Sequence, residues 1–282
     1  MGGQELQTTQ TLHFYRIPND MHPLNYTQYA WMIPQTLYKL LARSYIDYKF
    51  PRHIYIETTT RCNLQCPSCP RPDVEEDMRM ETFLKIIDEC KKYGPRSFSL
   101  HGFGEPTMDP LLHFEMLHIK ARNKKNNVIL TTNGVKITTE AYDLADKIII
   151  TYKAPYNLDR YKPWKHKIMI RNFTDVPVPG SWKCETKEYH NFGGNVKSSM
   201  KTKKRYPCYH LWLSPMIAWN GDVLLCCNDP KHIKVLGNIK DKSIAEIWQG
   251  DELKRLRYLQ MAGVSSDNCI GCNVWSTYPR IF

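Results

Sequence analysis

Long apolar runs are missing from this sequence of 282 residues, which leaves no candidate for a membrane-spanning helix. The longest stretches without a charged side chain, residues 21–38 and 206–221, both contain Pro and Asn. The first ten residues lack the basic start and the apolar centre of a secretory signal. We therefore expect a cytoplasmic protein that does not bind a membrane.

Acidic residues are scarce relative to basic ones. The chain has 28 Asp and Glu against 39 Lys and Arg, which gives a net charge of +11. This excess favours a substrate or partner with anionic groups but carries no information about the fold. One basic run, residues 197–205, is either a solvated surface or a contact for phosphate, carboxylate or nucleic acid. We expect a small-molecule or peptide substrate with anionic groups and favour it over nucleic acid.

Composition also excludes a disordered chain and a disulfide scaffold. Hydrophobic residues make up 42% of the chain, which is enough for a packed core. The ten cysteines are too few for a disulfide scaffold of this length, and in a reducing compartment clustered thiols more often bind metal. Eight of the ten fall into two groups, Cys62, Cys66 and Cys69, and then Cys208, Cys226, Cys227, Cys269 and Cys272.

From residue 51, short apolar runs alternate with helical patterns, which predicts an α/β fold with parallel strands covered by helices. Five strands are too few to close an eight-stranded barrel, so we expect an open, partial (β/α) barrel. The predicted strands are His53–Glu57, Ser97–His101, Asn127–Thr131, Lys147–Thr151 and Lys167–Arg171, and the predicted helices are Glu81–Tyr93, Asp109–Asn123 and Thr138–Ala145.

Four segments are expected along the chain. Residues 1–50 form an N-terminal extension that contains one helix, and residues 51–180 form the partial barrel. Residues 181–207 are a linker, and residues 208–282 are a small domain held by its thiols.

Within this last segment, the pair Asn220-Gly221 predicts a hairpin between residues 211–219 and 222–226. Residues 243–262 predict one amphipathic helix.

The first thiol group has the spacing C-x3-C-x2-C directly after a predicted strand. Three thiolates on one short loop can bind three corners of a cubane iron–sulfur cluster, and the fourth iron can then take another ligand. Most electron-transfer clusters have four Cys ligands, so the missing fourth is informative. The alternative is a zinc knuckle, although the paired C-x2-C spacing usual for structural zinc is absent here.

This loop resembles the cluster loop of the radical S-adenosylmethionine (radical SAM) superfamily. The resemblance implies a [4Fe–4S] cluster on Cys62, Cys66 and Cys69, with SAM bound to its open iron. It also implies that one electron cleaves SAM to a 5′-deoxyadenosyl radical, which removes a hydrogen atom from the substrate. An electron donor such as flavodoxin or ferredoxin follows from this chemistry.

Further motifs follow the predicted strands as they do in this superfamily. Phe103-Gly104-Glu105 resembles the Gly-Gly-Glu motif that holds the amino group of SAM, with Phe103 in place of the first Gly. Thr132-Asn133 belongs to a stretch that resembles the Thr-Asn-Gly motif. The strand ends are also where barrel enzymes build their active sites. The implied SAM-binding residues are Phe103, Gly104, Glu105, Thr132, Asn133, Thr151 and Arg171.

The second thiol group resembles the C-terminal SPASM or "twitch" domain of many radical SAM enzymes. Gly221 stands five positions before Cys226, as in that domain, and a C-x2-C pair comes near the end. The resemblance implies one auxiliary [4Fe–4S] cluster that accepts or supplies an electron. The alternative is a structural zinc ion on the same thiolates. The implied ligands are Cys208, Cys226, Cys269 and Cys272.

A layout with one auxiliary cluster resembles 2-deoxy-scyllo-inosamine dehydrogenase and several radical SAM epimerases. It implies either dehydrogenation, in which the auxiliary cluster takes an electron, or epimerisation, in which a thiol returns a hydrogen atom. Candidate catalytic residues are Cys227 and Cys184 as donors and Tyr152 facing the substrate. Cys227 is expected to point away from the cluster, because neighbours on a strand face opposite sides. The runner-up function is a non-enzymatic, zinc-binding module that binds nucleic acid.

Overall fold

The structure is a computed structural model. The helix expected in the N-terminal extension and most of the basic run lie outside the residues that it describes. Within the described ranges, no helix is both long enough and apolar enough to cross a membrane. The described residues are 49–152, 157–174, 176–198, 200, 208, 210–261, 264 and 269–274.

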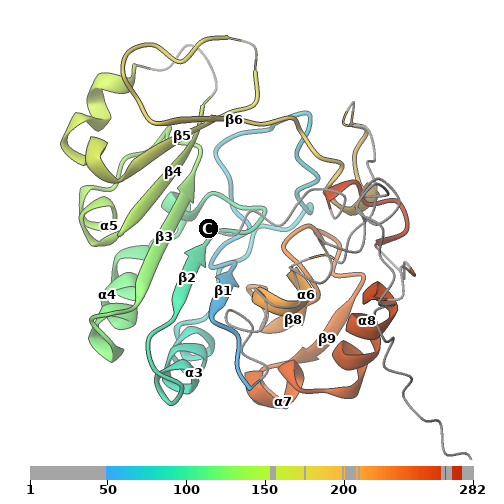
Figure 1. Ribbon diagram of the computed structural model, residues 1–282. Helices are drawn as coiled ribbons and strands as arrows, with labels where there is room; N and C mark the ends of the chain where they lie inside the picture. Colours follow the sequence, from blue (N-terminus) through green and yellow to red (C-terminus); the bar gives the residue numbers. More distant parts are fainter. Residues whose placement is uncertain are drawn as a thin grey trace, which may run out of the picture. The chain divides into compact units, whose positions relative to one another are not determined.

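A nine-stranded sheet runs through the described part of the chain (Figure 1). Its strands are β1 (His53–Ile56), β2 (Ser97–Leu100), β3 (Asn127–Thr132), β4 (Lys147–Tyr152), β5 (Ile168–Asn172), β6 (Cys184–Thr186), β7 (Met216–Ile217), β8 (Asp222–Leu224) and β9 (Val235–Asn238). The spatial order is β6-β5-β4-β3-β2-β1-β7-β8-β9. Neighbours from β6 to β7 pair parallel, and β8 pairs antiparallel with both β7 and β9. The first five strands match the predicted ones to within one residue at either end.

A helix connects each pair of consecutive strands from β1 to β5, as parallel crossovers usually do. Helices α3, α4 and α5 lie along one face of the sheet (Figure 1). The α-helices are α3 (Met80–Lys91), α4 (Leu112–Arg122), α5 (Thr139–Leu144), α6 (His210–Leu213), α7 (Ile244–Trp248) and α8 (Asp251–Met261). Three 3-10 helices, η1 (Pro106–Met108), η2 (Leu158–Lys167) and η3 (Phe192–Gly194), occupy loops.

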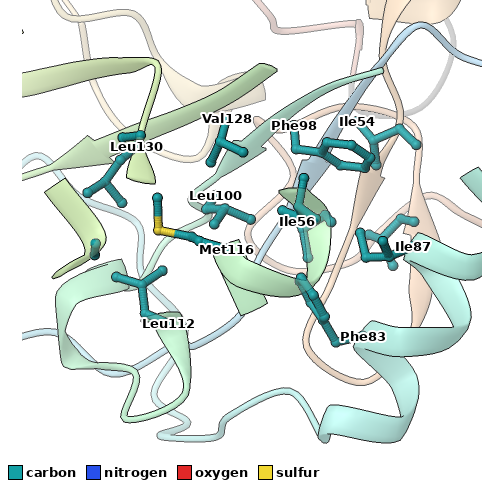
Figure 2. Packing of buried hydrophobic residues seen from close by; sticks show 14 of the residues in the cluster. Ile54, Ile56, Phe83, Ile87, Phe98, Leu100, Leu112, Met116, Val128 and Leu130 are labelled. Carbon is teal, nitrogen blue, oxygen red and sulfur yellow. The ribbon is translucent and has the colours of Figure 1, made fainter. Parts of the chain in front are cut away.

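The main hydrophobic core lies between the sheet and the helices α3, α4 and α5 (Figure 2). Every second strand residue points to the helices, for example Ile54 and Ile56 in β1, and meets Phe83 of α3 or Met116 of α4. These side chains are fully buried. Burial of one such side chain stabilises the fold by about 1.5–3 kcal/mol, so this layer fixes the strands and therefore the loops at their ends.

The intervening strand residues face the other side of the sheet, which we call the inner face. Register pairing places one row of them side by side across the strands, because paired residues of parallel strands share a face. Unlike the helix-facing layer, this face is largely polar or only half-buried. The inner face includes Tyr55, Ser99, Ile129, Thr151 and Arg171.

One prediction about the linker was wrong. Residues 184–186 form β6, which pairs parallel with β5 and gives the sheet a sixth parallel strand before β7. A strand of three residues is too short to show an alternating pattern, so only its pairing with β5 defines it.

The predicted hairpin is only partly present. Its turn forms as expected, with Gly221 at φ +91°. Its first half instead starts as α6, because Leu211 and Trp212 are buried against a cluster that includes Leu256 of α8. Pro215 follows this short helix and cannot extend it.

The predicted single helix over residues 243–262 is two helices. Ser243 and Glu246 form a capping box that starts α7. Gly250 separates α7 from α8, and a Cβ there would lie 3.1 Å from the carbonyl oxygen of Ile247. The chain can therefore turn at Gly250, because glycine has no side chain that would press on this carbonyl.

Hydrogen bonds of Glu89 and Arg257 hold the C-terminal helices in place. The carboxylate of Glu89 in α3 accepts hydrogen bonds from the backbone N–H groups of Ile244 and Ala245, at 2.8 and 2.9 Å. Arg257 of α8 donates to the carbonyl of Leu211 at 2.8 Å and stacks on Trp248. The elements around the second thiol group are therefore attached to each other and to α3.

Candidate functional site

The first thiol group lies on the loop that follows β1. Cys62 and Cys66 are half-buried and Cys69 is exposed, and the N–H of Cys69 donates to the carbonyl of Cys66 at 3.0 Å. At the base of this loop, the hydroxyl of Thr59 donates to Asp77 at 2.7 Å. Arg61 pairs with the same carboxylate at 3.2 Å. The base is therefore fixed while the three thiols stay accessible at the tip.

Gly104 brings the loop after β2 directly against this loop. A Cβ at Gly104 would lie 2.1 Å from the carbonyl oxygen of Thr59, so only glycine fits. The N–H of Glu105 donates to the carbonyl of Arg61 at 2.7 Å. The N–H of Phe103 donates to the buried carboxylate of Glu57 at 2.9 Å. Burial raises the pKa of Glu57, a residue that the sequence analysis missed.

The carboxylate of Glu105 joins the loops after β2 and β3. It accepts hydrogen bonds from the backbone N–H of Thr107 at 3.1 Å, the hydroxyl of Thr132 at 2.5 Å and the N–H of Asn133 at 2.6 Å. The side chain is buried. The sequence assigned this carboxylate to the amino group of SAM. Both of its oxygens already accept hydrogen bonds from the chain, so in this structure Glu105 holds the neighbouring backbone in place. Its contact with SAM stays a prediction.

Asn133 connects the end of β3 to the first cysteine. Its amide donates to Oδ1 of Asn63 at 2.7 Å and lies 3.9 Å from Sγ of Cys62. The sequence predicted Asn133 but missed Asn63, which has no spacing signal of its own. The next residue, Gly134, has φ +74° and is closed in by Ile150, so glycine is required there too.

Two other predicted residues, Thr151 and Arg171, are register partners on the inner face. Arg171 lies 3.8 Å from Glu185, which also pairs with Lys187 at 3.1 Å. This group carries a net positive charge of one.

His101 follows β2 on the same face, with its ring 5.1 Å from that of Tyr55. Burial, together with the charge of Arg171, lowers the pKa of His101 to about 3. The ring is therefore neutral at physiological pH.

The second thiol group is assembled from three separate segments. Cys208 precedes α6, Cys226 follows β8, and Cys269 and Cys272 share one loop. All four sulfur-bearing residues line one pocket, together with Leu211 and other apolar side chains. Burial, followed by the neighbouring thiols, raises the pKa of Cys226 well above its ordinary value. Binding of iron would supply the positive charge that such thiolates need.

The donor sets of both sites fit iron–sulfur clusters. Four thiols around an apolar pocket can satisfy every iron of a cubane, and three thiols on a loop leave one iron open. Within the described residues, no group of three or more His, Cys, Asp or Glu side chains converges as ligands of a single ion would.

Cys226 and Cys227 point to different environments, as predicted. Cys226 lines the pocket of thiols, whereas Cys227 packs against the cluster of Met216, Ala218 and Leu224, as Tyr55 of the inner face also does. The sulfur of Cys227 lies 4.0 Å from Nε2 of His210. Burial raises the pKa of Cys227 to about 12, so it is a protonated thiol in this structure.

The structure does not bring the other two candidate catalytic residues to this face. Cys184 is exposed, and its register partner is Ile170, which belongs to the helix-facing core. Tyr152 is buried in that same core. The prediction that Tyr152 faces the substrate is wrong. Side chains alternate along a strand, and it is the preceding residue, Thr151, that lies on the inner face.

A segment in the expected linker contacts both sites. The ring of Phe192 lies 5.9 Å from that of Phe103, and Gly193 lines the pocket of thiols. Phe192 has φ +46°, which is rare for a bulky residue and marks a constrained turn. The sequence signal was the pair Gly193-Gly194, whose φ angles are +68° and +92°. The sequence analysis interpreted it only as a loop.

Two family profiles match this chain. The radical SAM superfamily profile matches residues 56–153, and the SPASM profile, an iron-sulfur cluster-binding domain, matches residues 208–273. The chain has a radical SAM domain and a SPASM domain. The radical SAM domain implies SAM and a [4Fe–4S] cluster, and the SPASM domain implies auxiliary iron–sulfur clusters. The predicted family and fold class are therefore confirmed, as are SAM and iron–sulfur clusters as cofactors; the single auxiliary cluster stays a prediction.

Curated relatives match the chain over part of their length. The tungsten-containing aldehyde ferredoxin oxidoreductase cofactor-modifying protein of Pyrococcus furiosus is 34% identical over 93 residues, 32% of this chain and 26% of the relative. GTP 3′,8-cyclase of Desulforamulus reducens is 28% identical over 132 residues, 44% of this chain and 40% of the relative. The matched region thus spans less than half of either relative.

Solved radical SAM structures share the fold. BtrN in complex with AdoMet and 2-DOIA has a TM-score of 0.65 and 22% identity, covering 80% of this chain and 94% of BtrN. Streptococcus suis SuiB bound to S-adenosylmethionine has a TM-score of 0.52 and 15% identity, covering 91% and 78%. anSMEcpe with bound AdoMet and Cp18Cys peptide has a TM-score of 0.52 and 16% identity, covering 75% and 84%.

Proposed function

We propose that this protein is a radical SAM oxidoreductase that dehydrogenates a polar substrate with anionic groups. When bound, SAM and its reduced cluster supply a 5′-deoxyadenosyl radical that removes a hydrogen atom from a substrate carbon. The proposed ligands of that cluster are Cys62, Cys66 and Cys69. Oxidation then requires that a second electron leave the substrate, together with a proton.

The chain's own residues hold this site in shape. Glu105 and Asn133 tie the loops after β2 and β3 to the cluster loop. The backbone of Phe103 and Gly104 lies beside that loop and is proposed to bind the amino group of SAM. Arg171 is proposed to bind a carboxylate, either of SAM or of the substrate, because its group with Glu185 and Lys187 has a net positive charge.

One observation supports oxidation most directly. The pocket of four thiols adjoins the inner face, because Cys226 lines the pocket and the next residue, Cys227, packs beside the inner face. A cluster with four protein ligands has no open iron for a substrate, so an electron-accepting role fits it better than substrate binding. The proposed acceptor of the second electron is therefore an auxiliary cluster on Cys208, Cys226, Cys269 and Cys272.

Epimerisation is a second candidate, and the position of Cys227 favours it. A thiol on the inner face can give its hydrogen atom to a substrate carbon radical: the S–H bond breaks, a C–H bond forms and a sulfur radical remains. Uptake of one electron from a flavodoxin- or ferredoxin-type donor and one proton from water restores the thiol. This route changes stereochemistry but not the oxidation state of the substrate.

Metal content and SAM cleavage test the proposal together. Protein reconstituted anaerobically is expected to hold about eight irons per chain, and a Cys62/Cys66/Cys69→Ala variant about four. With dithionite and SAM alone, only the unsubstituted protein should form 5′-deoxyadenosine. Stoichiometric zinc with little iron would overturn the proposal and favour the zinc-binding module.

A second measurement distinguishes dehydrogenation from epimerisation. With a substrate in hand, turnover in D₂O should leave an epimerised product with deuterium at the inverted carbon. Dehydrogenation instead gives a product two mass units lighter than the substrate. Cys227→Ala should abolish the first outcome and leave the second intact.

A further inference from the structure

Asn191 and Asn273 form a reciprocal pair that joins the segment before η3 to the loop of Cys269 and Cys272. The N–H of Asn191 donates to Oδ1 of Asn273 at 2.9 Å, and the N–H of Asn273 donates to Oδ1 of Asn191 at 3.1 Å. The side-chain amide of Asn191 also donates to the carbonyl of Gly271 at 2.6 Å. These hydrogen bonds fix the backbone of the ligand loop from outside it.

The other end of the Asn273 side chain is held as well. Its amide donates to Oγ of Ser198 at 3.3 Å and to the carbonyl of Met200 at 3.1 Å. Asn273 is only 3% exposed, so this is a satisfied, buried amide. Satisfied buried polar networks favour one arrangement of the backbone that carries them.

This arrangement of the backbone positions a hydrogen bond to the sulfur of Cys272. The N–H of Val274 donates to Sγ of Cys272 at 3.4 Å, and Asn273 is the residue between them. The orientation of the Val274 N–H therefore depends on where Asn273 is held. Hydrogen bonds to a cluster thiolate are one of the levers that set the reduction potential of an iron–sulfur cluster, because they stabilise the more negative, reduced form.

We propose that Asn191 and Asn273 are positioning residues that raise the reduction potential of the auxiliary cluster by holding the Val274 N–H on the Cys272 sulfur. The inference rests on the proposed function, and specifically on Cys272 as a ligand of that cluster. Neither asparagine is proposed to bind iron or substrate. A higher potential favours transfer of the second substrate electron to the cluster.

The test uses the full chain in the Cys62/Cys66/Cys69→Ala background, where only the auxiliary cluster contributes signal. Asn273→Ala and Asn191→Ala are compared with this background in a redox titration followed by electron paramagnetic resonance. At a fixed ambient potential, the ratio of oxidised to reduced cluster should rise about tenfold, which corresponds to about 59 mV for one electron.

Asn195→Ala is the matched control. Its amide donates to the carbonyl of Phe192 at 2.7 Å within the same segment, and the substitution should leave the ratio unchanged. Asn191→Ala removes the reciprocal pair from its other side without adding charge, so its ratio should also rise. This variant also decides the matter if Asn273→Ala fails to assemble a cluster.

Two results would overturn the inference, and they are distinguishable. An unchanged ratio in asparagine variants that hold about four irons would reject the positioning role alone. Absence of iron in the background protein would reject the ligand set, and the inference with it, before any potential is measured.

Discussion

The two thiol groups are built in opposite ways. Cys62, Cys66 and Cys69 lie on one loop and are half-buried or exposed. The other four thiols come from three segments and line one pocket, and Cys208 packs in a cluster with buried Trp212 and Trp248. A site that must admit SAM and an electron donor needs an open loop. A site that only exchanges electrons can be enclosed.

This difference in assembly implies a difference in vulnerability. The first group depends on contacts near its loop, such as those of Gly104 and Asp77. The second depends on contacts between distant parts of the chain. These include the hydrogen bonds from Arg257 to α6 and from Asn191 to the loop of Cys269 and Cys272. Substitutions that affect one group should therefore spare the other.

The largest expected effect comes from neighbouring cysteines. Cys226→Ala should lower the iron content from about eight to about four per chain, because it removes a ligand from the enclosed cluster. Cys227→Ala is the matched control and should keep all the iron, since its side chain packs against the Met216 cluster instead. Iron and sulfide analysis after anaerobic reconstitution provides the measurement. Equal losses in both variants would show that the two sulfurs share one site.

On exposure to air, the two clusters should lose their iron at different rates. The cluster on the accessible loop should lose its iron several-fold faster than the cluster in the apolar pocket, since solvent and oxygen reach it directly. Mössbauer or electron paramagnetic resonance spectra over time can follow each signal, with the Cys62/Cys66/Cys69→Ala protein as reference for the enclosed cluster. Simultaneous loss of both signals would contradict the difference in enclosure.

Gly104→Ala should disturb the first site through backbone overlap. The added methyl would press on the Thr59 carbonyl, so we expect a loss of about 3 kcal/mol in unfolding free energy together with the loss of SAM cleavage. Gly94→Ala separates sterics from backbone preference: φ is +81° there, but a Cβ meets nothing within 4 Å. It should cost only about 1 kcal/mol. Anaerobic urea unfolding measures both, and equal costs would refute the steric argument.

The smallest expected effect concerns the base of the cluster loop. Asp77→Asn weakens its pairing with Arg61, whose side chain is 46% exposed, so the loss should be about 0.5–1 kcal/mol. Asp251→Asn breaks an exposed pair with Lys254 and serves as the control, with no measurable change expected. Unfolding in urea checks both. A loss above 3 kcal/mol for Asp77→Asn would mean that the whole loop depends on this contact.

The sequence by itself determined much of this protein. Short apolar runs between helical patterns located the first five strands. Cysteine spacing identified the cluster loop, since three ligands on one short segment need no tertiary contact to be recognised. Cys226 and Cys227 do lie in different environments, but both come after the end of β8, so alternation along a strand is not the reason.

Tertiary structure decided the rest. Strand β6 exists only through pairing with β5, and α6 forms where Leu211 and Trp212 find a buried apolar partner surface. Tyr152 was misassigned because one residue of strand position reverses the face. The carboxylate of Glu105 serves the chain itself, and Asn191 reaches Asn273 across a gap in sequence that no spacing pattern covers. Such contacts join segments far apart in the chain, so the sequence holds their residues but not their proximity.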